Sequence, residues 1–210
     1  MANGRFITIE GIEGVGKSTH LAAIEAALRA AGQRVVMSRE PGGTPLGEAI
    51  RSVLLDPVHA GMTSDAELLL MFAARAQHLD KVIRPNVDAG AWVVSDRFTD
   101  ATYAYQGGGR EIDVSRIAVL EQWVQRGFQP DATLLLDAPV ALAMKRVEQR
   151  GNLDRFEQEQ HAFFERVRSV YLARAALAPQ RYHIVDATRP LAEVSQAVAQ
   201  VVQTLLARWA

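Results

Sequence analysis

The stretch EGIEGVGKSTH, residues 10–20, decides the fold of this 210-residue chain. Gly11, Gly16, Lys17 and Ser18 occupy every fixed position of G-x-x-x-x-G-K-[ST], the loop that cradles nucleotide phosphates. Glycines let successive backbone N–H groups turn toward phosphate oxygens, and the helix that follows adds its positive end. We expect Lys17 to reach the β and γ phosphates and Ser18 to ligate Mg²⁺. The loop predicts a nucleoside triphosphate site, but it does not identify the acceptor of the terminal phosphate.

The composition favours a single domain, residues 1–210, that binds small ligands. The chain is 49% hydrophobic, with 23 basic and 24 acidic residues, so it lacks the basic excess of nucleic-acid-binding proteins. The absence of cysteine excludes disulfides and thiolate metal sites, and the five histidines show no metal-ligand spacing. We see no secretory signal, and the longest apolar stretch is far shorter than the ~20 residues of a membrane span. A cytoplasmic protein without nucleic-acid or membrane partners is expected.

Five short apolar runs, at residues 5–10, 34–38, 91–95, 132–137 and 182–186, are expected to be strands. Several are apolar almost throughout, which is typical of strands buried on both faces of a parallel sheet. Helical patterns lie between them. Residues 17–31 end at Gly32, Ser64-x-x-Glu67 forms a capping box, and apolar residues recur at helical spacing from Leu191 to Leu205. This alternation predicts a three-layer α/β fold with a five-stranded parallel sheet.

Polar motifs follow the first three strands, at the edge where such sheets bind ligands. Arg97 can fork onto a phosphate and Asp96 can hold Mg²⁺ or its waters, although a surface salt bridge is the simpler alternative. Glu13 is either a solvated carboxylate or an acceptor for a hydroxyl of a second substrate. Phe72 and Arg75 share a helix face. There the ring can stack on a base and the guanidinium can donate to base carbonyls, although a lone phenylalanine is more often a core residue.

Taken together, these motifs resemble the thymidylate kinase family. The resemblance runs from about Phe6 to the final helix. It is carried by GIEGVGKS (11–18), REPGGTPLGE (39–48), Phe72 with Arg75, DRFTDATYAYQGGGR (96–110) and RGNLDRFE (150–157). It implies a P-loop NTPase fold of the nucleoside monophosphate kinase type, with a short lid at about residues 147–159. It also implies a homodimer that transfers the γ-phosphate of ATP, bound with Mg²⁺, to dTMP.

The resemblance assigns roles to individual residues. The implied ATP-binding residues are Gly11, Ile12, Glu13, Gly14, Val15, Gly16, Lys17, Ser18 and Thr19, and Arg189 stands in the loop that we expect on the adenine side. The implied dTMP-binding residues are Glu13, Arg39, Pro41, Phe72, Arg75, Arg97, Thr102, Tyr105 and Gln106. The implied catalytic residues are Lys17, Asp96, Arg97, Arg150 and Arg155, with Ser18 and Asp96 as Mg²⁺ ligands.

The phosphate loop reads IEGV between its fixed glycines and contains no arginine there. Its basic partners stand instead at Arg150 and Arg155, which looks like the bacterial type with lid arginines. Two other interpretations stay open at this level. A kinase of another nucleotide or small acceptor shares the loop and sheet but does not need Phe72 and Arg75 beside REPGG. A nucleotide switch is less favoured, because the chain has no N-K-x-D base motif.

Overall fold

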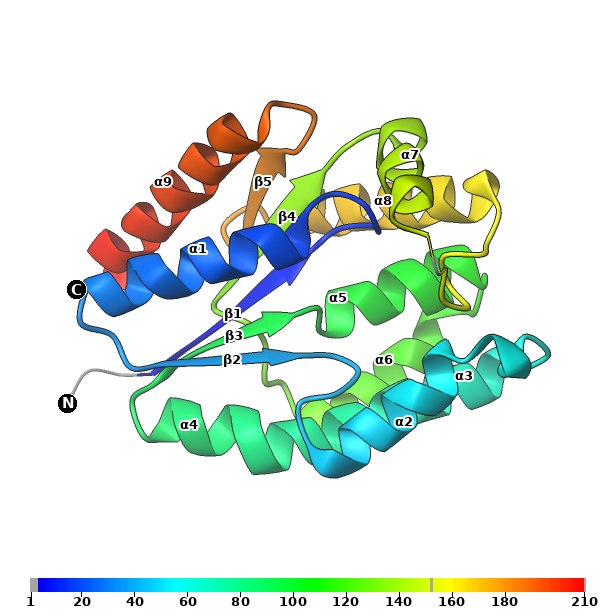
Figure 1. The fold of residues 1–210 in the computed structure, drawn as a ribbon. Coiled ribbons are helices and arrows are strands. Elements are labelled where there is room, and N and C mark those ends of the chain that lie inside the picture. The colour runs from blue at the N-terminus through cyan, green and yellow to red at the C-terminus, as the bar shows by residue number, and fades with distance from the viewer. Residues whose placement is uncertain (1–3, 152, 210) are drawn as a thin grey trace.

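A five-stranded parallel sheet forms the centre of the molecule (Figure 1). The structure is a computed structural model that describes residues 4–151 and 153–209, with the side chain of Arg150 also outside the described part. The strand order is β2-β3-β1-β4-β5, and each neighbouring pair is parallel. The strands are β1 (Arg5–Glu10), β2 (Val35–Arg39), β3 (Trp92–Asp96), β4 (Ala132–Asp137) and β5 (Tyr182–Asp186). The predicted α/β fold class is confirmed.

Helices cover both faces of the sheet and make the three layers. Figure 1 shows α1 (Lys17–Ala30) and α9 (Leu191–Trp209) side by side on one face, with α4 (Arg84–Asp88) and α6 (Val114–Gln125) across the sheet. Along β1, Ile7 and Ile9 join the main core with Ile24 of α1. Phe6 belongs to a second cluster, where its ring meets Phe98 edge-on at 4.9 Å. β1 is therefore buried on both faces, as a central parallel strand requires.

The remaining helices surround the carboxyl ends of the strands. They are α2 (Pro45–Leu55), the short 3₁₀ helix Pro57–His59, α3 (Ser64–His78), α5 (Thr99–Thr102), α7 (Val140–Arg150) and α8 (His161–Leu177). Two π-helical segments, Leu79–Ile83 and Tyr103–Gly109, continue α3 and α5. Such segments are rare and often lie at functional sites, and the second one carries Tyr105 and Gln106. Within the described ranges, no helix has the length and hydropathy that crossing a membrane requires.

Strands β2 and β3 each lie one residue later than predicted. The reason is register: Arg39 pairs with Asp96, and Asp96 pairs with Ile9 of β1. The two charged residues therefore end their strands instead of following them. Their backbones are fixed by the sheet.

The predicted capping box of α3 is wrong. Thr63, not Ser64, caps the helix, and its Oγ1 accepts a hydrogen bond from the N–H of Ala66. Glu67 is fully buried one turn into the helix, where its carboxylate binds Arg110 and Arg155. Glu67, which the local pattern assigned to the helix cap, therefore forms long-range ion pairs instead.

The final helix begins directly after Pro190, close to where the sequence predicts it. Its buried face contains Val194, Val198, Val202 and Leu205. Leu191 is exposed, although the pattern placed it on the same face. The periodicity thus predicts the helix but not the end of its buried stripe.

Candidate active site

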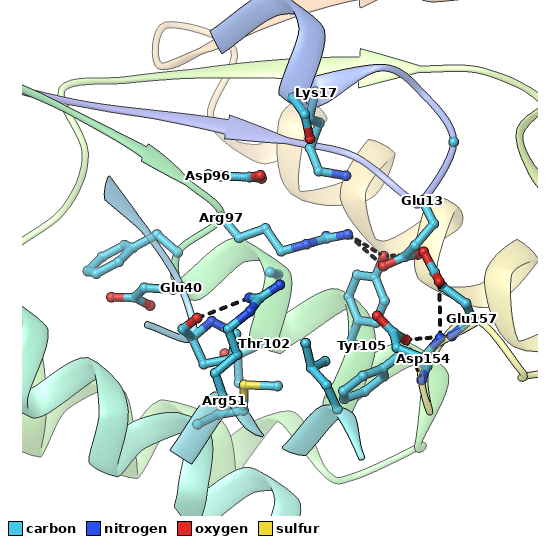
Figure 2. Close-up of a pocket in the computed structure, with 18 of the residues that line it drawn as sticks. Glu13, Lys17, Glu40, Arg51, Asp96, Arg97, Thr102, Tyr105, Asp154 and Glu157 are labelled. Atoms are coloured by element: carbon cyan, nitrogen blue, oxygen red, sulfur yellow. Dashed lines mark hydrogen bonds and ion pairs between the residues drawn. The ribbon is translucent and has the colours of Figure 1, made fainter. Parts of the chain in front are cut away.

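A cavity of about 600 Å³ lies at the carboxyl ends of β1, β2 and β3, the edge predicted to bind ligands. Figure 2 shows side chains from the phosphate loop, β3 and α2 converging on it. The predicted site residues that line it are Glu13, Gly14, Gly16, Lys17, Ser18, Thr19, Pro41, Arg75, Asp96, Arg97, Thr102, Tyr105 and Gln106. Motifs far apart in the sequence therefore share one cavity.

The phosphate loop forms one end of this cavity. Gly14 has φ +75°, and a Cβ there would lie 2.0 Å from the carbonyl oxygen of Ala143, so a side chain does not fit. Ile12 and Val15 turn their side chains into the core and anchor the loop from behind. The loop backbone is left to face the cavity.

Lys17 is the cation of this end. Its Nζ donates to the carbonyl oxygens of Gly11 at 3.0 Å and Ile12 at 2.8 Å. Burial lowers the pKa of Lys17 to about 8, and the charge of nearby Arg97 acts in the same direction. Burial thus disfavours the ammonium on the loop, and a bound anion would favour it.

Arg97 stands between the two ends of the cavity and forks onto four groups. Nη1 donates to the carbonyl oxygen of Gly11 at 2.9 Å and to the hydroxyl of Tyr171 at 3.0 Å. Nη2 donates to Glu13 Oε1 at 2.7 Å and to the Tyr105 hydroxyl at 2.9 Å (Figure 2). The backbone of Arg97 has φ +70°, a strained conformation for a non-glycine residue that is typical of functional sites.

The buried carboxyl group of Glu10 binds two of the groups that position Arg97. Glu10 Oε1 accepts from the Phe98 N–H and Oε2 accepts from the Tyr171 hydroxyl, both at 2.8 Å. Burial first, and then the nearby charge of Asp100, raise the pKa of Glu10 to about 8. Glu10 therefore fixes Phe98, which follows Arg97, and Tyr171, whose hydroxyl accepts from Arg97.

Arg75 forms the opposite end of the cavity. Its Nε donates to Glu40 Oε2 at 2.7 Å, and its Nη2 donates to Thr102 Oγ1 at 2.9 Å and to the carbonyl oxygen of Phe98 at 3.2 Å. Nη1 is buried and has no hydrogen-bond partner among the described residues. A buried donor without a partner at a cavity wall is a group that a ligand oxygen would satisfy.

Phe72 does not reach the cavity, which corrects the expectation that its ring faces a ligand. It is only 2% exposed and packs with Leu68, Ile112 and Ile117. Met71, one residue earlier, lines the cavity instead. One position turns a helical side chain by about 100°, because a turn holds 3.6 residues. The sequence therefore placed Arg75 correctly, whereas the Phe72 ring backs the Arg75 guanidinium, with Cζ 4.8 Å from the ring centroid, instead of facing the cavity.

Two predicted basic residues also lie away from the cavity lining. The Arg39 side chain is 53% exposed and pairs with Glu48 at 2.7 Å. Arg189 is exposed as well and pairs with Asp186 at 3.1 Å. The structure thus leaves both arginines at the surface.

Two other arginines line the cavity and were not predicted. Arg51 of α2 donates from Nη1 to the carbonyl oxygen of Pro41 at 3.1 Å. Arg146 of α7 donates to the carbonyl oxygen of Ala187 at 3.1 Å. Thr44, which caps α2 ahead of Pro45, was a readable signal that a helix starts beside the site. Nothing in the sequence distinguishes Arg146 from its basic neighbours.

Arg155 is held away from the cavity. Its Nε donates to the carbonyl oxygen of Leu54 at 2.7 Å, and its Nη2 lies 2.7 Å from Glu67 Oε2. Its neighbours Asp154 and Phe156 line the cavity. The predicted side-chain role of Arg150 falls outside the described residues.

The donors present fit an Mg²⁺ ion bound mainly through phosphate. Among the described residues there is no cluster of three or more His, Asp or Glu side chains placed to hold a metal. Asp96 Oδ1 is buried and has no hydrogen-bond partner among the described residues. Asp96 and Ser18 both line the cavity. Mg²⁺ commonly takes one or two protein oxygens and fills its shell with phosphate and water.

Comparisons with known proteins place the chain beside one family. The family model "Thymidylate kinase" matches residues 9–198. The thymidylate kinase of Chromohalobacter salexigens is 59% identical over 211 residues, covering 100% of both chains, and that of Pseudomonas fluorescens is 58% identical over 205 residues, covering 98% of each. The crystal structure of thymidylate kinase from Ehrlichia chaffeensis is 34% identical, has a TM-score of 0.76 and covers 96% of this chain and 99% of its own.

The pKa of Lys17 predicts proton uptake on nucleotide binding. Above a pH of about 8 the free protein holds Lys17 mostly neutral, whereas a bound polyphosphate favours the ammonium. Affinity for ADP should therefore fall as pH rises through this value. Calorimetry at pH values near 8, in two buffers of different ionisation enthalpy, should detect net uptake. Lys17→Arg should abolish this uptake, and equal heats in both buffers for the unaltered protein would contradict the assignment.

Proposed function

The chain belongs to the thymidylate kinase family, and from this premise we propose how its residues transfer the γ-phosphoryl group of ATP to dTMP to give ADP and dTDP. The observation that carries the proposal is the continuous cavity with Lys17 at one end, Arg75 at the other and Arg97 between them. Phosphoryl transfer depends mainly on alignment and charge neutralisation, which is what such a cavity supplies.

ATP is proposed to bind at the phosphate-loop end. The backbone of residues 11–16 faces its phosphates, Lys17 binds the β and γ groups, and Ser18 and Thr19 lie at the start of α1, where its positive end points to the same anion. Asp96 and Ser18 would hold Mg²⁺, which neutralises charge on the phosphates when bound. Arg146, between the phosphate loop and Ala187, would lie on the adenine side in the place first assigned to Arg189.

The phosphate of dTMP is proposed to bind between Arg97 and Arg51. Both side chains line the cavity, and hydrogen bonds to protein carbonyl oxygens hold both guanidinium groups in place. Planar guanidinium groups suit phosphate because they can donate two parallel hydrogen bonds. Arg51 thus replaces Arg39 among the dTMP-binding residues that the resemblance implied.

The thymine ring is proposed to lie against Met71, and one of its carbonyl oxygens is proposed to accept a hydrogen bond from Arg75 Nη1. A polarizable thioether packs well against a flat ring, and the free guanidinium donor suits a carbonyl oxygen. Thr102 and Gln106 line the same end, where they complete the polar edge. A complex in which the nucleobase makes no contact with Met71 would contradict this placement.

The sugar is proposed to lie beside Tyr105 and Glu13. Both line the cavity, and the Tyr105 hydroxyl is bonded to Glu13 Oε2. The Glu13 carboxylate can accept from a 3′-hydroxyl while it keeps its bond to Arg97. The Tyr105 ring would crowd a 2′-hydroxyl and so favour deoxyribose.

Residues 147–159 are proposed to act as the lid, with Arg150 and Arg155 as its cations. Arg155 would have to leave Glu67 and the Leu54 carbonyl before it could touch ATP. An arginine inserted at the transferring phosphate contributes about 10³–10⁵ in rate in related reactions. An unchanged kcat in Arg155→Ala would contradict this role.

A second copy of the chain is the proposed partner. Leu69 of α3 and Val119 and Trp123 of α6 are more than half exposed, and α3 and α6 pack against each other. Such grouped apolar side chains favour an interface between subunits.

We place the enzyme in the cytoplasm, in keeping with a chain without cysteine.

The acceptor is tested by coupled ADP release with ATP-Mg²⁺ and each of dTMP, dUMP, dCMP and AMP. We expect dTMP to give the highest kcat/KM, and dCMP and AMP to fall at least about a hundredfold below it, because a donor-only guanidinium cannot pair with their amino groups. Turnover of AMP or dCMP in preference to dTMP would refute the assignment. Nucleotide binding without acceptor-dependent ADP release would indicate a switch.

Arg51→Ala and Arg39→Ala form a matched pair for the acceptor phosphate. Loss of Arg51 should raise the KM for dTMP roughly tenfold to a hundredfold, because a charge-assisted hydrogen bond contributes ~1.5–3 kcal/mol. Arg39→Ala should stay within about threefold of the unaltered enzyme, since its side chain points to Glu48 at the surface. Steady-state kinetics at saturating ATP measures both. A larger effect at Arg39 than at Arg51 would return the role to the REPGG turn.

A further inference from the structure

A buried chain of hydrogen bonds lies behind Arg75. His78 Nδ1 lies 2.9 Å from Glu40 Oε1, and His78 Nε2 lies 2.6 Å from Ser38 Oγ. Glu40 uses its other oxygen, Oε2, to accept from Arg75 Nε at 2.7 Å. His78, Glu40 and Arg75 are each no more than 4% exposed. One carboxylate therefore joins the imidazole to the guanidinium.

The REPGG turn is shaped around this imidazole. Gly43 has φ +75°, and a Cβ at this position would lie 2.5 Å from Ser38 Oγ and 2.7 Å from His78 Nε2. Only glycine lets the turn approach so closely. His78 is thus enclosed by β2, the turn and the end of α3, which leaves the ring little freedom to move.

Glu40 determines which Arg75 donor stays free. With Nε on Glu40, and Nη2 on Thr102 and the Phe98 carbonyl, only Nη1 lacks a partner among the described residues. The bond from His78 holds Glu40 Oε1 away from the guanidinium. A carboxylate without that bond could turn and pair with Nε and Nη2 together, the two donors on one edge of the guanidinium. This would displace Thr102 from Nη2 and change the direction of Nη1.

We propose that His78 is a positioning residue for base selection: through Glu40 it holds Arg75 with one free donor directed at the nucleobase. This inference rests on the proposed dTMP kinase function and extends it to residues that do not touch the substrate. A group that can only donate hydrogen bonds can pair with a ring carbonyl oxygen but not with an amino group. The chain Ser38–His78–Glu40 therefore favours keto pyrimidines, such as thymine, over cytosine.

Two substitutions of His78 separate positioning from packing. His78→Asn keeps an amide donor near Nδ1, within reach of Glu40, whereas His78→Gln places its amide near Nε2, beside Ser38. We expect His78→Gln to raise the KM for dTMP about tenfold and to reduce the preference for dTMP over dCMP by a similar factor, with kcat changed less than about threefold. His78→Asn should stay within about threefold of the unaltered enzyme in all three quantities.

Glu40→Gln provides an independent variant if His78→Gln fails to fold. Arg75 and His78 bind separate oxygens of Glu40, and an amide replaces one of those oxygens with a donor group, so KM and base preference should change as in His78→Gln. If His78 only fills space, melting temperatures will fall in the His78 variants while KM and preference stay unchanged, and the proposal is overturned. Failure of the unaltered enzyme to phosphorylate dTMP would refute the proposed function itself. Normal activity with unchanged preference in the variants refutes only the role of His78.

Discussion

Repulsion between two polyanions is the constraint on which the rest of this site depends. ATP and dTMP must meet with their phosphates in contact, and two unit charges 4 Å apart repel by about 4 kcal/mol at an effective dielectric constant near 20. Lys17, Arg97 and Arg51 bring positive charge to one cavity from three segments of the chain. Arg97 is central, because its strained backbone at the end of β3 directs the guanidinium between the two proposed phosphate sites.

Carboxylates hold two of the cavity arginines in place. Arg97 is held by Glu13, and Arg75 is held by Glu40. A buried arginine without such a partner would be costly. A preorganised donor avoids reorganisation during the reaction, which is how fixed charges lower a barrier most effectively. Arg75 combines such fixation with a donor left over, because Nη1 has no hydrogen-bond partner among the described residues.

The sequence predicted the parts that contiguous motifs determine. The phosphate loop, the five strands and the positions of Asp96 and Arg97 depend on local patterns, and the sheet brings them to one edge. Side-chain direction on helices was harder to predict. Phe72 and Met71 differ by one position, yet only Met71 faces the cavity, and Arg51 emerged only once the start of α2 was known. Glu67 resembled a local cap, but its ion pairs with Arg110 and Arg155 form between segments far apart in the sequence. Local patterns carry no information about such pairs.

The most direct test of the central role of Arg97 is kcat/KM for dTMP in Arg97→Lys, measured together with the melting temperature. Lysine keeps the charge but cannot fork onto Gly11, Glu13 and the two tyrosine hydroxyls at once. We predict a loss of at least about a hundredfold in kcat/KM, because misaligned phosphates lose the advantage of orientation, in an enzyme that still folds. A folded Arg97→Lys enzyme within about threefold of the unaltered one would contradict the claim that this guanidinium aligns the two substrates.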